Sequence, residues 1–371
     1  MIDIPVAQHR IAVVMHDLRG GGAERATLNL VTGLLAAGRR VDLVLVKAEG
    51  EYRDQVPAGA RLIDLDKNSV RAAIPALKAY LRATRPASVL SALTHVNLAV
   101  LIAHRLSGIV SRITIVEHNQ LRIKVAQAPT LGRRMVYQAA RRFYRLADNV
   151  VAVSADQAAD LAAFTGLPPE AVLCAPNPVF DEAALTAAAN EPVSHPWLQT
   201  RDVPVVVAAG RLHRQKGFDL LLEAVQLIND RSPCRLIILG EGPERAGLTQ
   251  MAHHYGLGDR VDLPGFVQNP FAIMARASVF VLSSRWEALP TVLIEAMACG
   301  APVVATDCPT GPREILDDGR WGRLVPPANP RALAKAIERT LGEPRQSSRQ
   351  GAATYRITTA TARYLEILDR R

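Results

Sequence analysis

Residues 284–300 of this 371-residue chain read SRWEALPTVLIEAMACG, and they set its architecture. The apolar run 279–283 before them has the character of a buried strand, and Pro290 can begin a short helix. A second apolar run, residues 302–306, follows the helix. The segment therefore predicts strand, loop, helix and strand, the unit of a parallel α/β sheet.

The same alternation runs along the whole chain. Near-continuous apolar strands separated by helices indicate parallel sheets that are covered on both faces. The pattern starts again near residue 204, after Ala175-Pro176-Asn177-Pro178, which cannot form a helix. We therefore expect two doubly wound domains facing a cleft, residues 1–178 and 179–352, and a helix in residues 353–371 that returns to the first domain. The expected strands are 11–15, 41–46, 88–93, 113–117, 149–154, 172–175, 205–210, 236–240, 261–263, 279–283, 302–306 and 322–325.

Composition restricts the class of protein. No apolar run approaches the roughly 18 residues of a membrane span, and the N-terminus does not read as a secretory signal. The 4 cysteines follow neither a zinc spacing nor a disulfide framework, which favours a cytoplasmic protein. Residues 1–178 carry 22 basic and 14 acidic side chains, against 22 and 21 in the rest. This excess predicts an anionic partner for the first half.

Residues 118–147 concentrate that charge, with seven basic side chains and no acidic one. Apolar and aromatic residues are interleaved with them, and Arg134, Arg141 and Arg145 fall on one helical face. A basic helix of this kind indicates contact with an anionic membrane surface. A solvated helix face would give the same pattern, whereas nucleic-acid binding would need a docking motif that is absent.

Two loops combine a strand end with residues suited to anions. Gly21 and Gly22 precede a helix, where backbone N–H groups can approach a phosphate. An ordinary flexible turn would have the same sequence pattern. In Gly210–Gly217, Arg211 and Lys216 follow the first strand of the second half, an arrangement suited to a diphosphate. The fingerprint G-x-G-x-x-G is missing, which disfavours a nicotinamide oxidoreductase.

Three further groups are candidates. Glu287 and Glu295 could serve as acid and base, or could accept hydrogen bonds from ligand hydroxyls; a glutamate near a helix N-terminus is also simply stabilised there. His118 ends a strand within a polar trio and could be catalytic or structural. Asp64-Leu65-Asp66 has the form of a D-x-D metal motif, but chance supplies about one such pair in a chain of this composition.

Taken together, these residues resemble the retaining, nucleotide-sugar-dependent glycosyltransferases of family 4, group 1, with the GT-B fold of two Rossmann-like domains. The resemblance covers most of the chain, in family order. Its pieces are Gly21-Gly22-Ala23-Glu24, Val153-Ser154, Pro176-Asn177-Pro178, Gly210-Arg211, Lys216-Gly217, Gly240-Glu241-Gly242, Leu263-Pro264-Gly265-Phe266 and the block from Glu287 through Glu295 to Val304.

The resemblance implies a role for each matched residue. Arg211 and Lys216 would neutralise the donor diphosphate, Glu287 would lie by the donor sugar, and His118 would sit near the sugar and the acceptor. Contacts to the rest of the donor would come from Gly21, Gly22, Glu241, Phe266, Val267, Leu289, Pro290, Thr291 and Glu295, with Glu295 on the ribose and Phe266 and Val267 framing the base.

The resemblance also implies the reaction. We expect a hexose or N-acetylhexosamine to pass, with retention, from a UDP-sugar to a glycan or a polyprenyl-pyrophosphate-linked acceptor, on the inner face of the bacterial plasma membrane. Arg134, Arg141 and Arg145 would face that membrane or acceptor, and no metal or other cofactor is expected. A nucleotide-sugar epimerase, a glycan phosphorylase and a binding protein without turnover are the alternatives. A phosphorylase would be far longer.

Overall fold

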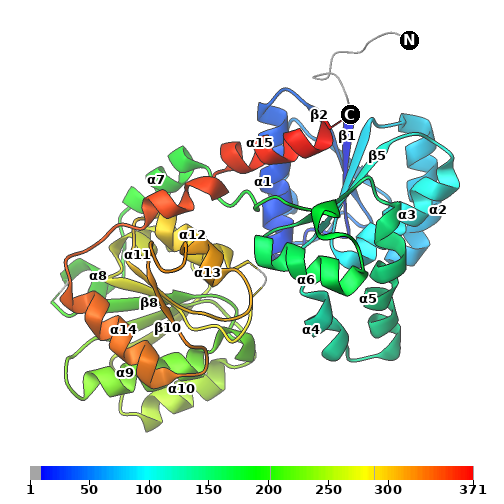
Figure 1. Cartoon of the computed structure of the whole chain (residues 1–371). Coiled ribbons are helices and arrows are strands. Elements are labelled where there is room, and N and C mark those ends of the chain that lie inside the picture. Colours follow the sequence, from blue (N-terminus) through cyan, green and yellow to red (C-terminus); the bar gives the residue numbers. More distant parts are fainter. Residues whose placement is uncertain (1–9, 201, 288, 371) are drawn as a thin grey trace. The chain divides into compact units, whose positions relative to one another are not determined.

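The computed structural model of the chain describes residues 10–200, 202–287 and 289–370. They form two compact units (Figure 1): unit 1 runs to Val179 and takes up the chain again at Tyr355, and unit 2 is Phe180–Thr354. A seven-stranded parallel sheet forms unit 1 and a six-stranded parallel sheet forms unit 2. The predicted pair of doubly wound parallel sheets is confirmed.

Unit 1 has the strand order β3-β2-β1-β4-β5-β6-β7, with helices on both faces. The order reverses between β1 and β4, which pair in parallel. Buried apolar positions fill most of each central strand and form a core with the helices. The strands are β1 (Arg10–Met15), β2 (Arg40–Leu45), β3 (Arg61–Asp64), β4 (Ser88–Ala92), β5 (Arg112–Glu117), β6 (Asn149–Ala152) and β7 (Val172–Cys174). The helices are α1 (Gly22–Ala36), α2 (Val70–Thr84), α3 (Thr94–Ser107), α4 (Leu121–Ala126), α5 (Leu131–Phe143), α6 (Ala155–Thr165) and α15 (Ile357–Leu368).

Unit 2 has the order β10-β9-β8-β11-β12-β13 and reverses between β8 and β11. Its core lies between the sheet and helices such as α9 and α14. The strands are β8 (Val205–Ala209), β9 (Arg235–Leu239), β10 (Val261–Gly265), β11 (Val279–Leu282), β12 (Val303–Thr306) and β13 (Arg323–Val325). The helices are α7 (Glu182–Asn190), α8 (Pro196–Thr200), α9 (Phe218–Asn229), α10 (Arg245–His254), α11 (Pro270–Arg276), α12 (Thr291–Ala298), α13 (Pro312–Ile315) and α14 (Pro330–Gly342).

The last helix, α15, packs against α1 within unit 1 (Figure 1). Gly33 makes this possible, because a Cβ at that position would lie 2.0 Å from Thr361 Oγ1. On the other side of the contact, Tyr364 and Ile367 of α15 are buried. None of the helices in the described residues is long and apolar enough to cross a membrane.

One strand, β3, was not predicted from the sequence. The strand β3 lies at the edge of its sheet and reads Arg-Leu-Ile-Asp, with three of its four residues exposed. It therefore lacks the continuous apolar run by which the other strands were recognised. Asp64, at its end, accepts hydrogen bonds from the backbone N–H groups of Ala48 and Asp66 at 3.1 and 2.8 Å, so its carboxylate caps a turn.

Candidate functional site

Two loops leave the sheet of unit 2 side by side where the strand order reverses. β8 ends at Ala209 and leads into residues 210–217, and its neighbour β11 ends at Leu282 and leads into residues 283–290. Open α/β sheets bind ligands at the carboxyl ends of the strands, at this point of reversal. The fold therefore brings together the basic loop and the first glutamate, two groups that the sequence analysis had selected separately.

Lys216 and Glu287 are in direct contact. Lys216 Nζ donates a hydrogen bond to Glu287 Oε1 at 2.7 Å, and the side chains are 19% and 6% exposed. Ser284 Oγ donates to the same oxygen at 2.6 Å, while Gln215 Nε2 reaches Oε2 at 3.4 Å. The carboxylate is thus fixed from several sides, and its charge is balanced by the lysine. Ser284 and Gln215 were missed from the sequence, since nothing in their spacing reveals the contact.

The backbone holds the two loops equally tightly. Ser283 Oγ donates to the carbonyl oxygen of Lys216 at 2.8 Å, and Thr310 Oγ1 donates to that of Glu287 at 3.0 Å. Gly217 has a φ of +63°, and a Cβ there would lie 2.2 Å from the carbonyl oxygen of Ser283. Only glycine therefore allows the basic loop to approach β11 this closely.

Arg211 is a second cation of this site, beside Lys216. The aliphatic part of the Lys216 side chain lies against Gly210, where a Cβ would lie 3.2 Å from Lys216 Cε. Arg211 is the next residue in the chain, so its backbone lies close to the lysine. Arg211 is exposed, and no acidic group pairs with it among the described residues. Arg285 differs, because both its terminal nitrogens donate to Asp219, at 2.7 and 2.6 Å. An anion entering here would meet an uncompensated guanidinium and a lysine already shared with a carboxylate.

The second glutamate lies on α12, which begins after Pro290. Glu295 is 8% exposed, and Leu289 and Pro290 are buried beside the helix start, whereas Thr291 is half-buried. The first N–H groups of a helix have no partner within it and can bind oxygen ligands. Burial, with the charge of Glu295 as a second cause, raises the pKa of Cys299 to about 12, so this thiol stays protonated and is a poor nucleophile.

Three predicted donor contacts lie at the carboxyl ends of β9 and β10. Phe266 is 82% exposed, and Val267 beside it is half-buried. Glu241 is also exposed and forms a bidentate pair with Arg245, at 2.9 and 2.6 Å. Hydrogen bonds from Arg245 lower the pKa of Glu241. An exposed ring at this edge can stack on a planar base, whereas Glu241 is already committed to the arginine.

In unit 1, the predicted glycine loop opens α1. Gly21 is the N-terminal cap, and a Cβ there would lie 2.3 Å from Glu24 Oε2, whereas a Cβ at Gly22 would meet nothing within 4 Å. The carboxylate of Glu24 therefore folds back over the helix start, and burial raises its pKa. A phosphate binding at this turn would have to displace that carboxylate.

A buried glutamate supports the loop that carries His118. Glu117 Oε2 accepts hydrogen bonds from Tyr144 Oη at 2.5 Å and Thr94 Oγ1 at 2.8 Å, and Oε1 accepts from the backbone and side-chain amides of Asn119 at 2.9 and 3.0 Å. Burial raises the pKa of Glu117. Glu117 belongs to the polar trio predicted at the end of this strand, but its supporting role for the loop could not be assigned from the sequence, because Thr94 and Tyr144 lie 23 and 27 positions away.

The turn before Thr94 is strained. Leu93 joins β4 to α3 with a φ of +76°, which costs a non-glycine residue about 1–3 kcal/mol and is found mostly at functional sites.

Two histidines near this turn have neutral rings. His95 stacks edge-on against His16, with ring centroids 5.4 Å apart. Burial lowers the pKa of both His95 and His118 to about 4, so both rings are neutral near pH 7. A neutral imidazole can accept a hydrogen bond from a hydroxyl group.

The predicted basic face is split between two elements. Arg134 and Arg141 lie on α5, but that helix ends at Phe143, and Arg145 lies on the following 3₁₀ turn (Tyr144–Leu146). All three arginines are exposed. Arg145 donates to the carbonyl oxygen of Arg141 at 3.3 Å, and the Arg141 guanidinium lies 5.6 Å from the ring centre of Phe164.

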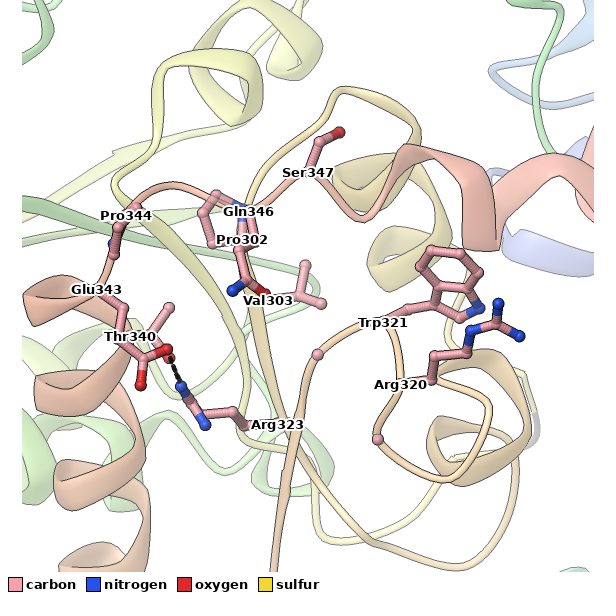
Figure 2. Close-up of a pocket in the computed structure, with 12 residues that line it drawn as sticks. Pro302, Val303, Arg320, Trp321, Arg323, Thr340, Glu343, Pro344, Gln346 and Ser347 are labelled. Carbon is pink, nitrogen blue, oxygen red and sulfur yellow. Dashed lines mark hydrogen bonds and ion pairs between the residues drawn. The ribbon is translucent and has the colours of Figure 1, made fainter.

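A polar pocket of about 220 Å³ lies elsewhere in unit 2 (Figure 2). Val303 and Arg323 in its wall begin β12 and β13, so it is at the amino edge of the sheet, away from the loops described above. Arg323 points toward Thr340 and Glu343 (Figure 2). Its Nε donates to Thr340 Oγ1 at 3.0 Å, and the same guanidinium pairs with Glu343. Its charged groups therefore satisfy one another, and we assign it no role in the site.

Comparison with known proteins covers both units. Residues 20–182 match the profile described as Glycosyltransferase Family 4, and residues 203–343 match Glycosyl transferases group 1. An alpha-D-kanosaminyltransferase of Streptomyces kanamyceticus is 33% identical over 169 residues, 43% of this chain and 44% of that protein. A Campylobacter jejuni 4-alpha-N-acetylgalactosaminyltransferase, named for a saccharide on diphospho-undecaprenol, is 33% identical over 136 residues, 37% of each chain. This chain thus matches less than half the length of either relative.

Solved structures share the whole fold. A structure of the Anabaena protein HepE in complex with UDP-glucose superimposes with a TM-score of 0.79 and 19% identity, over 97% of this chain and 99% of the other. The lipopolysaccharide outer core galactosyltransferase WaaB, in its apo form, gives a TM-score of 0.73 at 17% identity, over 96% and 98%. The GT-B architecture expected from the sequence resemblance is confirmed.

Proposed function

This chain belongs to the glycosyltransferases of family 4, group 1, and from that premise we propose that it is a retaining transferase of a hexose or an N-acetylhexosamine. The proposed donor is a nucleotide sugar of the UDP type, supported by the shared fold with the Anabaena structure that holds UDP-glucose. The proposed acceptor is a glycan or a lipid-linked saccharide. Unit 2 is the proposed donor side and unit 1, with α15, the proposed acceptor side.

One observation carries the proposal: the Lys216–Glu287 contact of 2.7 Å at the reversal point of the sheet, beside Arg211, which pairs with no acidic group in the part of the chain that the structure describes. A nucleotide sugar presents two chemistries within a few ångströms, an anionic diphosphate and a hydroxyl-rich ring. Arg211 and Lys216 suit the first, because preorganised cations stabilise the charge that develops on a departing diphosphate. The fixed carboxylate of Glu287 suits the second as a hydrogen-bond acceptor for sugar hydroxyls.

The transfer step needs no covalent enzyme intermediate. The acceptor oxygen forms a bond to the anomeric carbon while the bond from that carbon to the diphosphate oxygen breaks. The acceptor proton passes to the leaving diphosphate. Glu287 Oε1 already accepts hydrogen bonds from Lys216 and Ser284, which reduces its nucleophilicity and favours a positioning role. Two protein cations supply the charge for which other transferases use a metal ion, so we propose that activity is metal-independent.

The remaining donor contacts are proposed from position. The buried Glu295 is proposed to accept from the ribose hydroxyls, and the start of α12 to contact oxygen atoms of the donor. The exposed Phe266 ring is the proposed platform for the base, framed by Val267. In unit 1, His118 is proposed to meet the acceptor hydroxyl. Position in the fold is the sole support for the other proposed donor contacts, which are Gly21, Gly22, Glu241, Leu289, Pro290 and Thr291.

The acceptor proposal draws on unit 1 and on the relatives. The Campylobacter jejuni relative is named for an undecaprenol-linked saccharide, and others are named for lipopolysaccharide core synthesis in Rhizobium meliloti. Exposed Arg134, Arg141 and Arg145 would hold the protein against an anionic leaflet. We therefore propose peripheral association with the inner face of the plasma membrane.

A panel of nucleotide sugars tests the function. Each is added to the full chain, thermal stabilisation is measured, and slow hydrolysis of the stabilising sugar is then followed. One UDP-sugar should stabilise the protein and lose its sugar, and the Lys216→Ala variant should hydrolyse it far more slowly. Stabilisation without turnover would instead indicate a binding protein. Conversion of the donor into an isomeric nucleotide sugar would indicate an epimerase.

A further inference from the structure

Three helices of unit 1 enclose an open apolar cavity of about 500 Å³. Ile74 comes from α2, Leu98 and Ile102 from α3, and Val136 and Ala139 from α5. The volume lies within the range of about 300–1,000 Å³ that holds small molecules. We call this cavity the helical groove. None of its wall is used by the donor chemistry described above.

The helical groove follows from the sequence of its helices. On α3 the lining residues recur every three or four positions, which places them in one stripe along the helix. On α5, Gly132 carries no side chain, and a Cβ there would meet nothing within 4 Å, so the groove is open at this end. The neighbouring Leu131 and Met135 are 73% and 63% exposed. These two side chains continue the apolar wall of the groove onto the surface, and contiguous exposed apolar patches can mark binding sites.

Two cations stand in the wall of the groove. Arg71 lies on α2 and Arg133 on α5, both are exposed, and neither is paired with an acidic side chain among the described residues. Along the chain, the seven basic residues of 118–147 likewise have no acidic residue among them. A wall that is apolar along its length and cationic at two points is complementary to a molecule with an apolar chain and an anionic head.

The groove also reaches the carboxyl edge of the sheet of unit 1, where β4 leads into α3. His95 lines it, and the preceding residue, Thr94, donates to Glu117 at 2.8 Å. Glu117 in turn precedes His118, the residue proposed to meet the acceptor. A chain in the groove would therefore bring its head group to the same edge as His118. The ring of His95 is neutral near pH 7, because burial lowers its pKa to about 4, so it does not add charge to the wall.

We propose that the helical groove binds the hydrocarbon chain of a phosphate-bearing lipid that carries the acceptor sugar, with Arg71 and Arg133 on its phosphate. This inference rests on the proposed function and names the acceptor class: a phospholipid-type carrier, acyl or isoprenoid, and not a free glycan. A second copy of the chain is disfavoured as the occupant, because a two-fold contact over the groove would bring like-charged arginines together.

A series of alkyl phosphates tests the groove, using the full chain and soluble chains from butyl to decyl phosphate. Burial of each methylene is worth about 0.8 kcal/mol, so affinity should rise about fourfold for each added methylene. Inorganic phosphate should bind far more weakly than decyl phosphate and should not saturate the same site. An affinity independent of chain length would overturn the proposal, because it would leave only the phosphate recognised.

Variants localise the site. Ala139→Phe and Gly132→Phe place a ring in the groove, and each should weaken decyl phosphate about tenfold or more, a loss of at least ~1.4 kcal/mol. Gly132→Phe is expected to fold even if Ala139→Phe does not, since its side chain starts in open space. Ala79→Phe, on the exposed side of α2, is the matched control and should bind like the wild type.

The charge is tested in the same assay. Arg71→Gln and Arg133→Gln should each weaken decyl phosphate, whereas Arg105→Gln, an exposed arginine of α3 outside the groove, should not. If the ring-filling variants bind decyl phosphate as the wild type does, or if they instead dissociate a dimer in solution, the groove is not a lipid site. Stabilisation by a nucleotide sugar is measured alongside. If no nucleotide sugar stabilises the wild type, the proposed function is contradicted. Binding of alkyl phosphates that depends on chain length would still support a lipid site in the groove.

Discussion

Replacement of Lys216 by methionine tests the site most directly, because it removes one charge from a nearly buried pair. Lys216 is 19% exposed and Glu287 is 6% exposed, so the remaining carboxylate would have little contact with water. Removing one partner of a buried ion pair costs about 3–5 kcal/mol. Ser284 Oγ still donates at 2.6 Å and Gln215 Nε2 at 3.4 Å. We therefore expect the free energy of unfolding of unit 2 to fall by about 2–3 kcal/mol.

The expected signals are measurable. A loss of ~2–3 kcal/mol corresponds to a decrease in Tm of about 4–12 °C for a domain of this size. The same variant should lose kcat by about 10²–10³, the effect of removing one group that stabilises developing charge. The double variant Lys216→Met/Glu287→Gln removes both charges. It should regain most of the stability, because no unpaired charge is left, but none of the activity.

The assays are thermal unfolding and the initial rate of sugar release from the stabilising nucleotide sugar. Lys335→Met, which replaces an exposed lysine on α14 of the same unit, serves as the control and should change neither quantity. A Lys216→Met variant that keeps both its Tm and a near-wild-type kcat would refute the role of this ion pair. A double variant that is less stable than either single variant would also refute it, since the two charges would then not be compensating each other.

Four further outcomes are expected. Arg211→Ala should lower kcat/KM at least ~100-fold. It should leave Tm nearly unchanged, because the side chain is exposed and has no acidic partner among the described residues. Retained turnover would contradict the diphosphate role. Burial lowers the pKa of His118 from 6.5 to about 4, so the unfolded chain takes up the proton at a higher pH than the folded chain does. Stability should therefore fall as the pH decreases from 6.5 to about 4. His118→Asn should flatten the slope of Tm against pH over this interval. Transfer should survive EDTA, and a complete loss restored by Mn²⁺ would indicate a metal. Reversing Arg134, Arg141 and Arg145 to glutamate should release the protein from anionic vesicles in a sedimentation assay, whereas unchanged binding would exclude this membrane contact.

Strands buried on both faces were predictable because their apolar runs are continuous. The run Val-Val-Val-Ala-Ala of β8 and its buried counterparts were found within a residue or two of their ends. The edge strand β3 was missed because exposure removes that signal. The groups at strand ends could be selected too, since parallel strands all end at one edge of a sheet.

Contacts between loops could not be predicted. Lys216 and Glu287 are 71 positions apart, and only the pairing of β8 with β11 brings their loops together. Tyr144 reaches Glu117 from a turn after α5, a partner that no short motif contains. The helical groove depends on how three helices pack, and periodicity within each helix does not determine the distance between them.

The contact of α15 with α1 has a consequence for truncated forms of this protein. Val179 N donates to the carbonyl oxygen of Tyr355 at 2.8 Å, so the chain leaves unit 1 and re-enters it at one place, and unit 2 is topologically an insertion. A stop codon just after residue 354 would leave the sequence of unit 2 complete. It would instead remove α15, including the buried Tyr364 and Ile367, and expose the surface of α1 around Gly33, which contacts Thr361 more than 300 positions along the chain. Loss of α15 is therefore expected to destabilise α1, although the two helices are far apart in the sequence.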